Sequence, residues 1–331
     1  MTAPDDRRDF LAEVAWLHHE FGFTQEEIAR RFDVSRSSIS RALAEAERLG
    51  VIQVVVTVPM RREARLAAEL SARLGVAATV GARAGDEPSH IAAARAAARL
   101  IERIGDAGNA TLAVSWGRTL AAAGGMVRPR ATTGIRVVDA VGHPGESAVT
   151  PTVEITRALA AALGASVVHL PSPAFVAPGP SLEALLQSEP VRRALELARA
   201  ADVTLVSVGV AGPGSMLLAE GLVSPSAMAE LLAGGAAGEV MGRWLDHDGR
   251  GLPAPNLEEV GLTVADLRAG RRVVGVAGGA EKAPAVLAAL RGQVVTELVV
   301  DDGLAEALLA QPQPSPSAGP APQPPQVGDV R

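Results

Sequence analysis

The chain has 331 residues, a formal net charge of −6 and no cysteine. Its length allows two domains, and the lack of thiols excludes disulfides, cysteine nucleophiles and cysteine-ligated zinc. No apolar run approaches the roughly 20 residues of a membrane helix, the first thirty residues are charged and the six histidines are scattered, so we expect a cytoplasmic protein with no metal, cofactor or membrane partner.

Two helices are predicted near the N-terminus. A helix over 9–21 is indicated by apolar residues at steps of four, three and four, namely Phe10, Val14, Leu17 and Phe21. Gly22 ends this helix. Thr24 begins the second helix with a capping box, in which its hydroxyl accepts from the amide of Glu27 and the Glu27 carboxylate reaches back. The inward residues of the second helix are expected to be Ile28 and Phe32.

A third helix follows after a short turn at Asp33–Val34. Ser35 is its predicted cap, and Gly50 is placed to stop it. Its buried stripe is predicted to consist of Ile39, Leu43, Ala46 and Leu49. Residues 51–58 are rich in β-branched side chains, which is typical of a strand or wing that leads out of the module.

The second and third helices have the geometry of a helix-turn-helix, whose second helix enters the major groove of DNA. We expect Thr24 and Gln25 to touch phosphates. The exposed face of the third helix supplies the candidate reading residues Arg36, Ser37, Ser38, Ser40 and Arg41, because arginine can fork onto guanine and serine suits base or phosphate. A plain three-helix packing unit with solvated arginines is the alternative, since the segment is slightly acidic.

Beyond a linker helix over 61–75, short apolar runs alternate with helical segments. The candidate strands are 77–80, 111–115, 135–140, 166–170, 203–208, 239–244, 272–277 and 295–300. Thr150–Pro151 and Ser224–Pro225 each pair a cap residue with proline at a helix start. This order predicts an α/β domain with a largely parallel sheet. We expect residues 1–59 to bind DNA, residues 60–310 to form the α/β domain and the proline-rich residues 311–331 to be disordered.

A candidate phosphate loop follows the strand at 111–115. It consists of Ser115, Trp116, Gly117, Arg118 and Thr119. Gly117 allows close backbone approach, the new helix start offers free N–H groups to an anion and Thr119 adds a hydroxyl. The spacing is not that of a P-loop, so nucleotide hydrolysis is not implied. A glycine that serves only the turn is the alternative.

Lys282 is the only lysine among the 31 basic residues. It follows a second glycine-rich junction, Gly278–Gly279, at the end of a predicted strand, where ligands bind in open parallel sheets. An ammonium that arginine has not replaced suggests a function, either as a point charge on phosphate or a sugar oxygen, or as an amine that condenses with an aldehyde. A solvated surface lysine is the alternative.

The run from Phe23 to Arg41 resembles the DNA-binding module of the SorC family of sugar-responsive bacterial regulators. The loop at 115–119 matches that family's phosphate loop, and its later motifs are matched by Pro171–Ala174, Gly242–Asp246 and Ala277–Gly279 with Lys282. The resemblance implies a sensor domain akin to phosphosugar isomerases, a sugar-phosphate effector, Asp246 and Lys282 on the sugar oxygens, and a homodimer or homotetramer on operator DNA.

Three functions remain open from the residues. The first is a DNA-binding transcriptional regulator, not an enzyme, controlled by a phosphorylated sugar. The second is a sugar-phosphate isomerase or aldolase-like enzyme, since Asp246, Glu281 and Asp301 supply carboxylates near Lys282. The third is a scaffold whose first domain binds protein. The loop at Val141–Glu146 departs from the family's Gly-Gly, so His143 and Glu146 are candidates for setting ligand identity, and a surface loop is an equally good interpretation.

Overall fold

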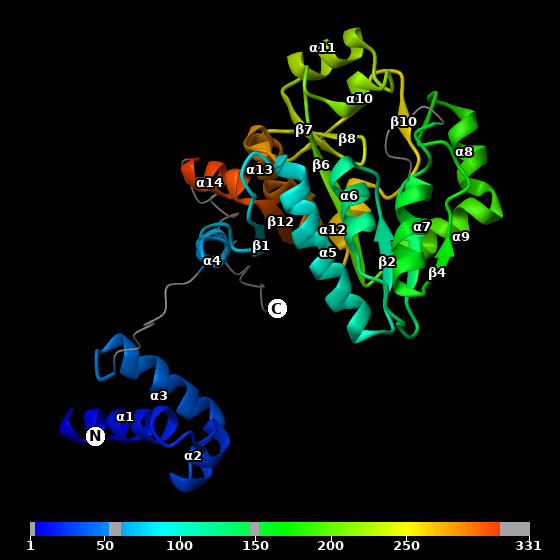
Figure 1. Ribbon diagram of the computed structural model, residues 1–331. Helices are drawn as coiled ribbons and strands as arrows, with labels where there is room; N and C mark the ends of the chain where they lie inside the picture. Colours follow the sequence, from blue (N-terminus) through cyan, green and yellow to red (C-terminus); the bar gives the residue numbers. More distant parts are fainter. Residues whose placement is uncertain (1–3, 53–60, 146–151, 312–331) are drawn as a thin grey trace, which may run out of the picture. The chain divides into compact units, whose positions relative to one another are not determined.

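The computed structural model describes residues 4–52, 61–145 and 152–311 (Figure 1). It divides into two compact units, Met1–Met60 and Arg61–Arg331, each with its own core. Most of the predicted wing, the Thr150–Pro151 helix start, Glu146 and nearly all of the proline-rich tail lie outside the described residues. Within the described ranges, no helix is long and apolar enough to cross a membrane.

The first unit contains α1 (Pro4–His19), α2 (Gln25–Arg31) and α3 (Arg36–Arg48). The predicted capping box at Thr24 is confirmed, with Glu27 bonding both the amide and the hydroxyl of Thr24 at 2.8 Å. Ser35 caps α3 as predicted. One apolar core joins the three helices through Leu11, Val14, Leu17, Ile28, Ile39, Ala42, Leu43 and Ala46. This packing fixes the angle between α2 and α3.

Two predicted core residues of this unit are wrong. Phe21 is 56% exposed and Leu49 is 46% exposed. Both lie just beyond the last helical residue, at His19 and Arg48, so they no longer follow the helical period that placed them inward. Phe21 instead packs edge to face against Trp16, with ring centroids 4.8 Å apart.

The second unit is built on a mostly parallel sheet, as predicted. Its parallel strands lie in the spatial order β1 (Ala77–Gly81), β12 (Glu297–Asp301), β11 (Val273–Ala277), β6 (Val203–Val210), β2 (Thr111–Val114), β3 (Arg136–Asp139) and β4 (Ser166–Val168). β6 is the central strand and pairs in parallel with both β11 and β2. The carboxyl ends of these three neighbours therefore meet at one edge of the sheet.

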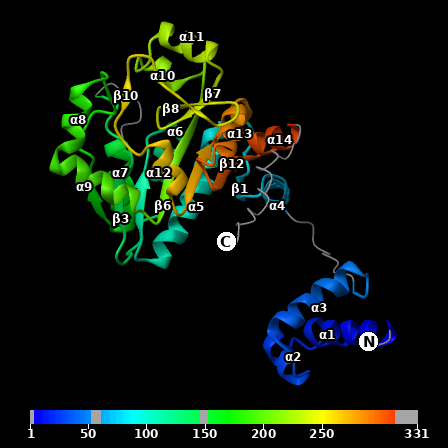
Figure 2. The ribbon, with the colours of Figure 1, turned by 180° about the vertical axis from the view of Figure 1, so that it is seen from behind.

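Helices cover both faces of this sheet (Figures 1 and 2). One face packs against α5 (Ser89–Ala107), α6 (Arg118–Met126) and α7 (Thr152–Leu163). The other packs against α4 (Arg62–Leu74), α9 (Glu189–Arg199), α12 (Val264–Ala269), α13 (Ala283–Arg291) and α14 (Asp302–Ala310). Along β11, Val274 and Val276 enter the first core while Val273 enters the second, as the two-residue period of a strand requires.

The strand predicted over 239–244 is wrong, because the chain turns within it. β7 (Ala236–Val240) and β8 (Arg243–Asp246) form an antiparallel hairpin, which β9 (Gly251–Leu252) extends. The turn residues Met241 and Gly242 have φ of +57° and +83°. Positive φ at both positions is the backbone of a two-residue hairpin turn. β7 pairs with the outer end of β6, so the hairpin stands on the carboxyl edge of the sheet.

The remaining elements lie around this framework. They are β5 (Phe175–Val176), which pairs with β10 (Glu258–Glu259), and the helices α8 (Pro180–Gln187), α10 (Met216–Ala219) and α11 (Pro225–Ala233). Ser224 caps α11 with proline at the first helical position, as predicted. From β2 the chain proceeds outward to β3 and β4, and from β6 it proceeds in the opposite direction to β11 and β12. The boundary between β2 and β6 is therefore a topological switch point, where open α/β sheets bind ligands.

Candidate functional site

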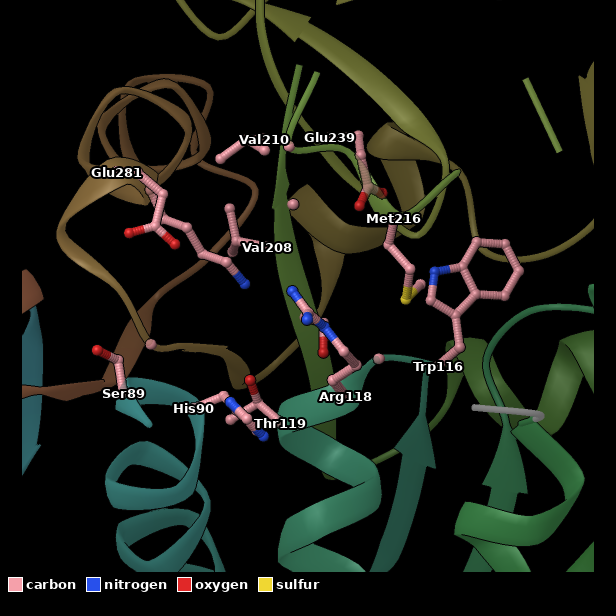
Figure 3. Close-up of a pocket in the computed structure, with 16 residues that line it drawn as sticks. Ser89, His90, Trp116, Arg118, Thr119, Val208, Val210, Met216, Glu239 and Glu281 are labelled. Carbon is pink, nitrogen blue, oxygen red and sulfur yellow. The ribbon is translucent and has the colours of Figure 1, made fainter. Parts of the chain in front are cut away.

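A cavity of about 320 Å³ lies at this switch point, where β2, β6 and β11 end. Six residues that the sequence predicted line it: Trp116, Gly117, Arg118, Thr119, Gly278 and Lys282. Figure 3 shows Arg118 in the middle of the cavity, with Glu239 on one side and His90 and Thr119 on the other. Segments more than 150 residues apart in the sequence thus meet at one place.

The first turn of α6 forms one wall. Gly117 has φ of +133°, and a Cβ at this position would lie 2.0 Å from Oγ of Ser207. Only glycine lets β2 turn into α6 this close to β6. The first intrahelical bond runs from the Ala121 amide to the Gly117 carbonyl. The amides of Arg118 and Thr119 therefore have no partner within the helix and can serve an anion.

Ser115 supports this wall from behind. It is fully buried and does not line the cavity. Its Oγ accepts from the Ser207 amide at 3.1 Å and donates to the Trp116 carbonyl at 3.0 Å. The first bond joins the ends of β2 and β6 and the second holds the loop itself, so we assign Ser115 to positioning the loop. Ser207 itself lines the cavity, and its buried hydroxyl has no hydrogen-bond partner among the described residues.

Two cations face the cavity, Arg118 from α6 and Lys282 from the turn before α13. Within the part of the chain that the structure describes, neither forms an ion pair with a carboxylate at salt-bridge distance. Burial lowers the pKa of Lys282, and the positive charge of Arg118 lowers it further, whereas Glu239 opposes this shift. A site with two such cations attracts an anionic ligand, which would relieve their repulsion.

Glu239 is the main residue that sequence reasoning missed. It is 5% exposed on β7, accepts a 2.6 Å hydrogen bond from the Gly242 amide and lines the cavity. Burial raises its pKa to about 7, although the Gly242 amide and Lys282 both lower it. A carboxylate inside an apolar strand is rare without a functional or structural partner, and that signal was present in the sequence.

Ser89 and His90, at the start of α5, were also missed. They line the cavity opposite Glu281, another residue outside the predicted effector set. Burial lowers the pKa of His90, and the charges of Arg118 and Lys282 lower it further, so its neutral imidazole can donate and accept near neutral pH. Gly278 brings this segment close, because a Cβ at Gly278 would lie 2.5 Å from the Ser89 carbonyl oxygen.

The other side of the cavity is apolar. It includes Trp116 and Met216, while the apolar residues Val208 and Val210 lie nearer to Glu281 (Figure 3). Trp116 is 1% exposed and packs on Phe175, with ring centroids 5.7 Å apart. A cavity that combines two cations with an indole and other apolar side chains suits a ligand with a charged group and C–H faces.

Three further predicted residues do not line the cavity. The Asp246 carboxylate accepts from the amides of Asp248 and Arg250, at 2.9 and 2.8 Å, and so stabilises the turn after β8. Gly279 has φ of +113° and donates its amide to Asp301. His143 pairs with Pro173 in an isolated bridge, and its Nδ1 is buried without a hydrogen-bond partner among the described residues. The hairpin turn at 241–242 explains why Asp246 does not line the cavity, because the chain reverses there and β8 runs away from the cavity.

In the first unit, α3 presents Arg36, Ser37, Ser40 and Arg41 to solvent, as predicted for its reading face. Nε of Arg41 donates to the Ser37 carbonyl at 3.2 Å. Arg36, at the first helical position, forms no ion pair among the described residues. The N-terminal half of α3 therefore offers two guanidinium groups and two hydroxyls on one accessible surface.

The other residues predicted to contact DNA are half-buried or have side chains that form helix caps. Ser38 is half-buried, and its Oγ lies 2.8 Å from Oγ of Ser35, the α3 cap. The Thr24 hydroxyl is exposed but already bonds Glu27 in the capping box. Gln25 is half-buried at the first position of α2. Of these residues, Gln25 is the one whose side chain is not used in a cap.

Comparison with known proteins also divides the chain into an N-terminal DNA-binding domain and a larger second domain. Residues 58–310 match the Sugar-bind family of sugar-binding domains, and residues 14–63 match the MarR family. The solved structure of the full-length sorbitol operon regulator SorC from Klebsiella pneumoniae has a TM-score of 0.68 at 23% identity, and the match covers 92% of this chain and 99% of that one. This likeness supports the fold.

Curated relatives extend the match over nearly the whole chain. The transcriptional regulator LsrR of Klebsiella pneumoniae is 30% identical over 308 residues, which cover 91% of this chain and 93% of the relative. The deoxyribonucleoside regulator of Bacillus subtilis is 26% identical over 310 residues, which cover 92% and 98%. The resemblance predicted from the motifs is thereby confirmed. The chain belongs to the SorC family of sugar-binding transcriptional regulators, with a helix-turn-helix for DNA and a separate domain for the sugar.

Proposed function

We propose that the sugar which controls this regulator is phosphorylated and binds in the cavity at the carboxyl edge of the sheet. One observation carries this proposal: Arg118 and Lys282 face the cavity, neither forms a salt bridge with any described carboxylate, and both lie beside the amides at the start of α6 that have no partner within the helix. A phosphate group accepts from such amides and neutralises such cations. A neutral sugar would leave the Arg118 guanidinium and the Lys282 ammonium without an anionic partner at salt-bridge distance among the described residues.

The rest of the cavity suits the sugar. Its volume of about 320 Å³ matches a single monosaccharide phosphate rather than an oligosaccharide. His90, Ser207 and Glu239 offer donors and acceptors for hydroxyl groups, while Trp116 and Met216 offer apolar contact for the C–H face of the ring. The Lys282 amine either pairs with the phosphate or condenses with an open-chain carbonyl, and both choices need an anionic or aldehyde ligand.

Control of transcription requires that the sugar bind one arrangement of the protein better than another. We propose that the working form is a homodimer or homotetramer, because a single helix-turn-helix reads one half-site and paired heads read two. The sugar then changes how the heads are spaced. Light scattering of the full chain with and without operator DNA measures the oligomer, and a monomer in both conditions would contradict this part of the proposal.

The phosphate is tested by thermal unfolding with matched pairs: glucose against glucose 6-phosphate, fructose against fructose 6-phosphate, and ribose against ribose 5-phosphate. We expect a rise in melting temperature with one phosphorylated member and none with its parent sugar. Arg118→Ala and Lys282→Ala should remove the rise. Arg99→Ala, an exposed α5 residue that does not line this cavity, is the control. A rise that both cavity variants retain would refute the site.

DNA control is tested with the DNA upstream of the chain's own gene. The stabilising sugar should change the affinity of the wild-type protein in a shift assay and should leave Lys282→Ala unchanged. If the protein instead consumes the sugar while its DNA affinity stays constant, the regulator assignment fails in its essential part.

An isomerase or aldolase-like activity is the second candidate, and a single observation favours it. Glu239, with a pKa near 7, shares the cavity with Lys282, and a general base works best with a pKa near the working pH. Incubation of each phosphosugar with the protein, followed by NMR, tests this activity. Its relatives are named as regulators, so we rank this candidate second.

A further inference from the structure

A line of charged residues runs from the cavity loop to the helix that follows the DNA-binding unit. At its first step, the Gly279 amide donates to Oδ1 of Asp301 at 2.9 Å. Gly279 stands between Gly278 and Lys282, so the position of the loop depends on this carboxylate. Asp301 is completely buried at the end of β12, where it also caps α14.

Arg83 forms the middle of the line. Its Nε lies 3.6 Å from Oδ2 of Asp301 and donates to Oδ1 of Asp302 at 3.0 Å. One guanidinium therefore holds two neighbouring carboxylates that are 0% and 8% exposed in their side chains. Removal of this cation would leave the buried Asp301 carboxylate without its arginine and Asp302 with Arg62 alone, an arrangement that the fold must relax.

Arg62 forms the far end. Its guanidinium donates to Oδ2 of Asp302 at 3.3 Å and also pairs with Glu306 on α14. Arg62 is the first residue of α4 and the second residue of the second unit, which begins at Arg61. The line thus begins at the cavity loop and ends on the first turn of the helix that enters the second unit.

We propose that these residues, Asp301, Arg83, Asp302 and Arg62, form a relay that couples the cavity loop to the start of α4. That a bound sugar drives this coupling rests on the proposed function. The coupling between the loop and α4 itself does not depend on it. A ligand that pulls on Gly278 and Lys282 shifts Gly279 against Asp301. Asp301 and Asp302 share Arg83, and Asp302 also pairs with Arg62. A shift of Asp301 therefore changes the contacts of Arg83, Asp302 and Arg62 together.

The four residues act as positioning residues, since none lines the cavity. Ordinary surface ion pairs contribute little and give way independently. Here the two carboxylates are buried and share Arg83, and Asp302 also pairs with Arg62, so the pairs are expected to behave as a unit. If these residues only stabilised the fold, substitution of Arg62 would lower stability and would not change the environment of Lys282 in the cavity.

The solitary lysine provides a direct readout that needs no knowledge of the ligand. Acetic anhydride at limiting concentration will acetylate Lys282, and mass spectrometry of the peptide that contains it gives the rate in the ligand-free full chain. We expect Arg83→Gln and Arg62→Gln each to change this rate by roughly threefold or more, in the same direction. Glutamine removes the charge and keeps most of the length.

Two matched variants serve as controls. Arg65 lies on the same helix, and among the described residues its one ion pair is with Glu69, at 3.7 Å, so Arg65→Gln is the first control. Arg95→Gln, which removes a pair with Glu87, is the second. Both should acetylate at the wild-type rate. If Arg83→Gln alters the rate and Arg62→Gln does not, the effect is local to Asp301 and the relay is overturned. Wild-type rates in both variants would overturn it equally.

A second arm addresses the signal, with D-fructose 6-phosphate as the probe. Arg83→Gln should bind operator DNA like the wild type without the probe, should still show protection of Lys282 by the probe, and should lose the probe's effect on DNA affinity. A retained effect would overturn the relay. If the wild-type protein itself shows no response to any phosphosugar, the proposed function fails, and the acetylation rates still decide the relay.

Discussion

The Gly242 amide donates a 2.6 Å hydrogen bond to the buried carboxylate of Glu239, across the turn that joins β7 to β8. The other oxygen of this carboxylate lies against the backbone of Gly209, where an added Cβ would approach within 2.0 Å. One glycine thus donates to the acid at the cavity wall, and the other leaves room for it. The hairpin that was not predicted from the sequence supplies the acid and its donor, and β6 supplies the space for it.

Glu239 gives the protein a pH dependence near neutrality. Its pKa is raised to about 7 in the folded protein, above its ordinary value of 4.5, so the folded state binds the proton more tightly. The stability from this proton is complete below pH 4.5 and is lost as pH rises through 7. Between pH 5 and pH 8, urea unfolding should show a loss of about 2 kcal/mol in the wild type that Glu239→Gln lacks. Parallel curves for both proteins would contradict this assignment.

Gly117→Ala should damage both stability and ligand binding. The φ of +133° is strained for alanine, and its Cβ would collide with Ser207. We expect a loss of about 2 kcal/mol in unfolding free energy. Gly125→Ala, in the same helix with open space around it, should be neutral or slightly stabilising. Equal effects from the two substitutions, measured by chemical denaturation, would show that the loop conformation is not required.

Arg36→Ala should weaken and broaden operator recognition. Its guanidinium is exposed at the start of α3, where a reading helix meets base edges. A base-reading arginine contributes about 1–3 kcal/mol of discrimination. Shift assays against operator and scrambled DNA measure the ratio. Arg48→Ala, at the other end of α3, should preserve it, and an unchanged ratio in Arg36→Ala would remove Arg36 from the reading face.

Thr24→Ala should loosen α2 without a direct effect on the reading face. The substitution removes the hydroxyl that bonds both the Glu27 amide and the Glu27 carboxylate, and it leaves the bond from the residue 24 amide to that carboxylate. Loss of an N-cap side chain lowers the stability of a helix by about 1 kcal/mol. Hydrogen exchange of the α2 amides in the full chain should therefore accelerate several-fold, while Ser40→Ala, on the exposed side of α3, leaves it unchanged. Equal exchange in wild type and Thr24→Ala would mean that packing alone holds α2.

Local signals explain what could be predicted. The caps at Thr24, Ser35 and Ser224 depend on neighbours within three residues, and all three were found from the sequence. Gly117 and Lys282 were found because strand ends of a parallel sheet share one edge. Phe21 and Leu49 failed because helical periodicity was carried one or two residues past a helix end.

Pairing between distant strands explains what could not be predicted. Glu239 reaches the cavity because its register on β6 places it opposite Gly209, 30 residues away. Nothing in the run from Ala236 to Asp246 specifies that register or shows that the chain reverses at Met241. The same reversal moved Asp246 from the expected site to a turn. Cross-strand register is therefore the information that the local pattern lacks.

Arg118 and Lys282 come from opposite sides of the switch point, the first after β2 and the second after β11. A single bound anion would therefore clamp together two halves of the sheet that are far apart along the chain. Because a ligand that binds only the folded state suppresses opening, the occupied protein should resist proteolysis longer than the empty one. The cellular lifetime of the regulator would then follow the supply of its own metabolite.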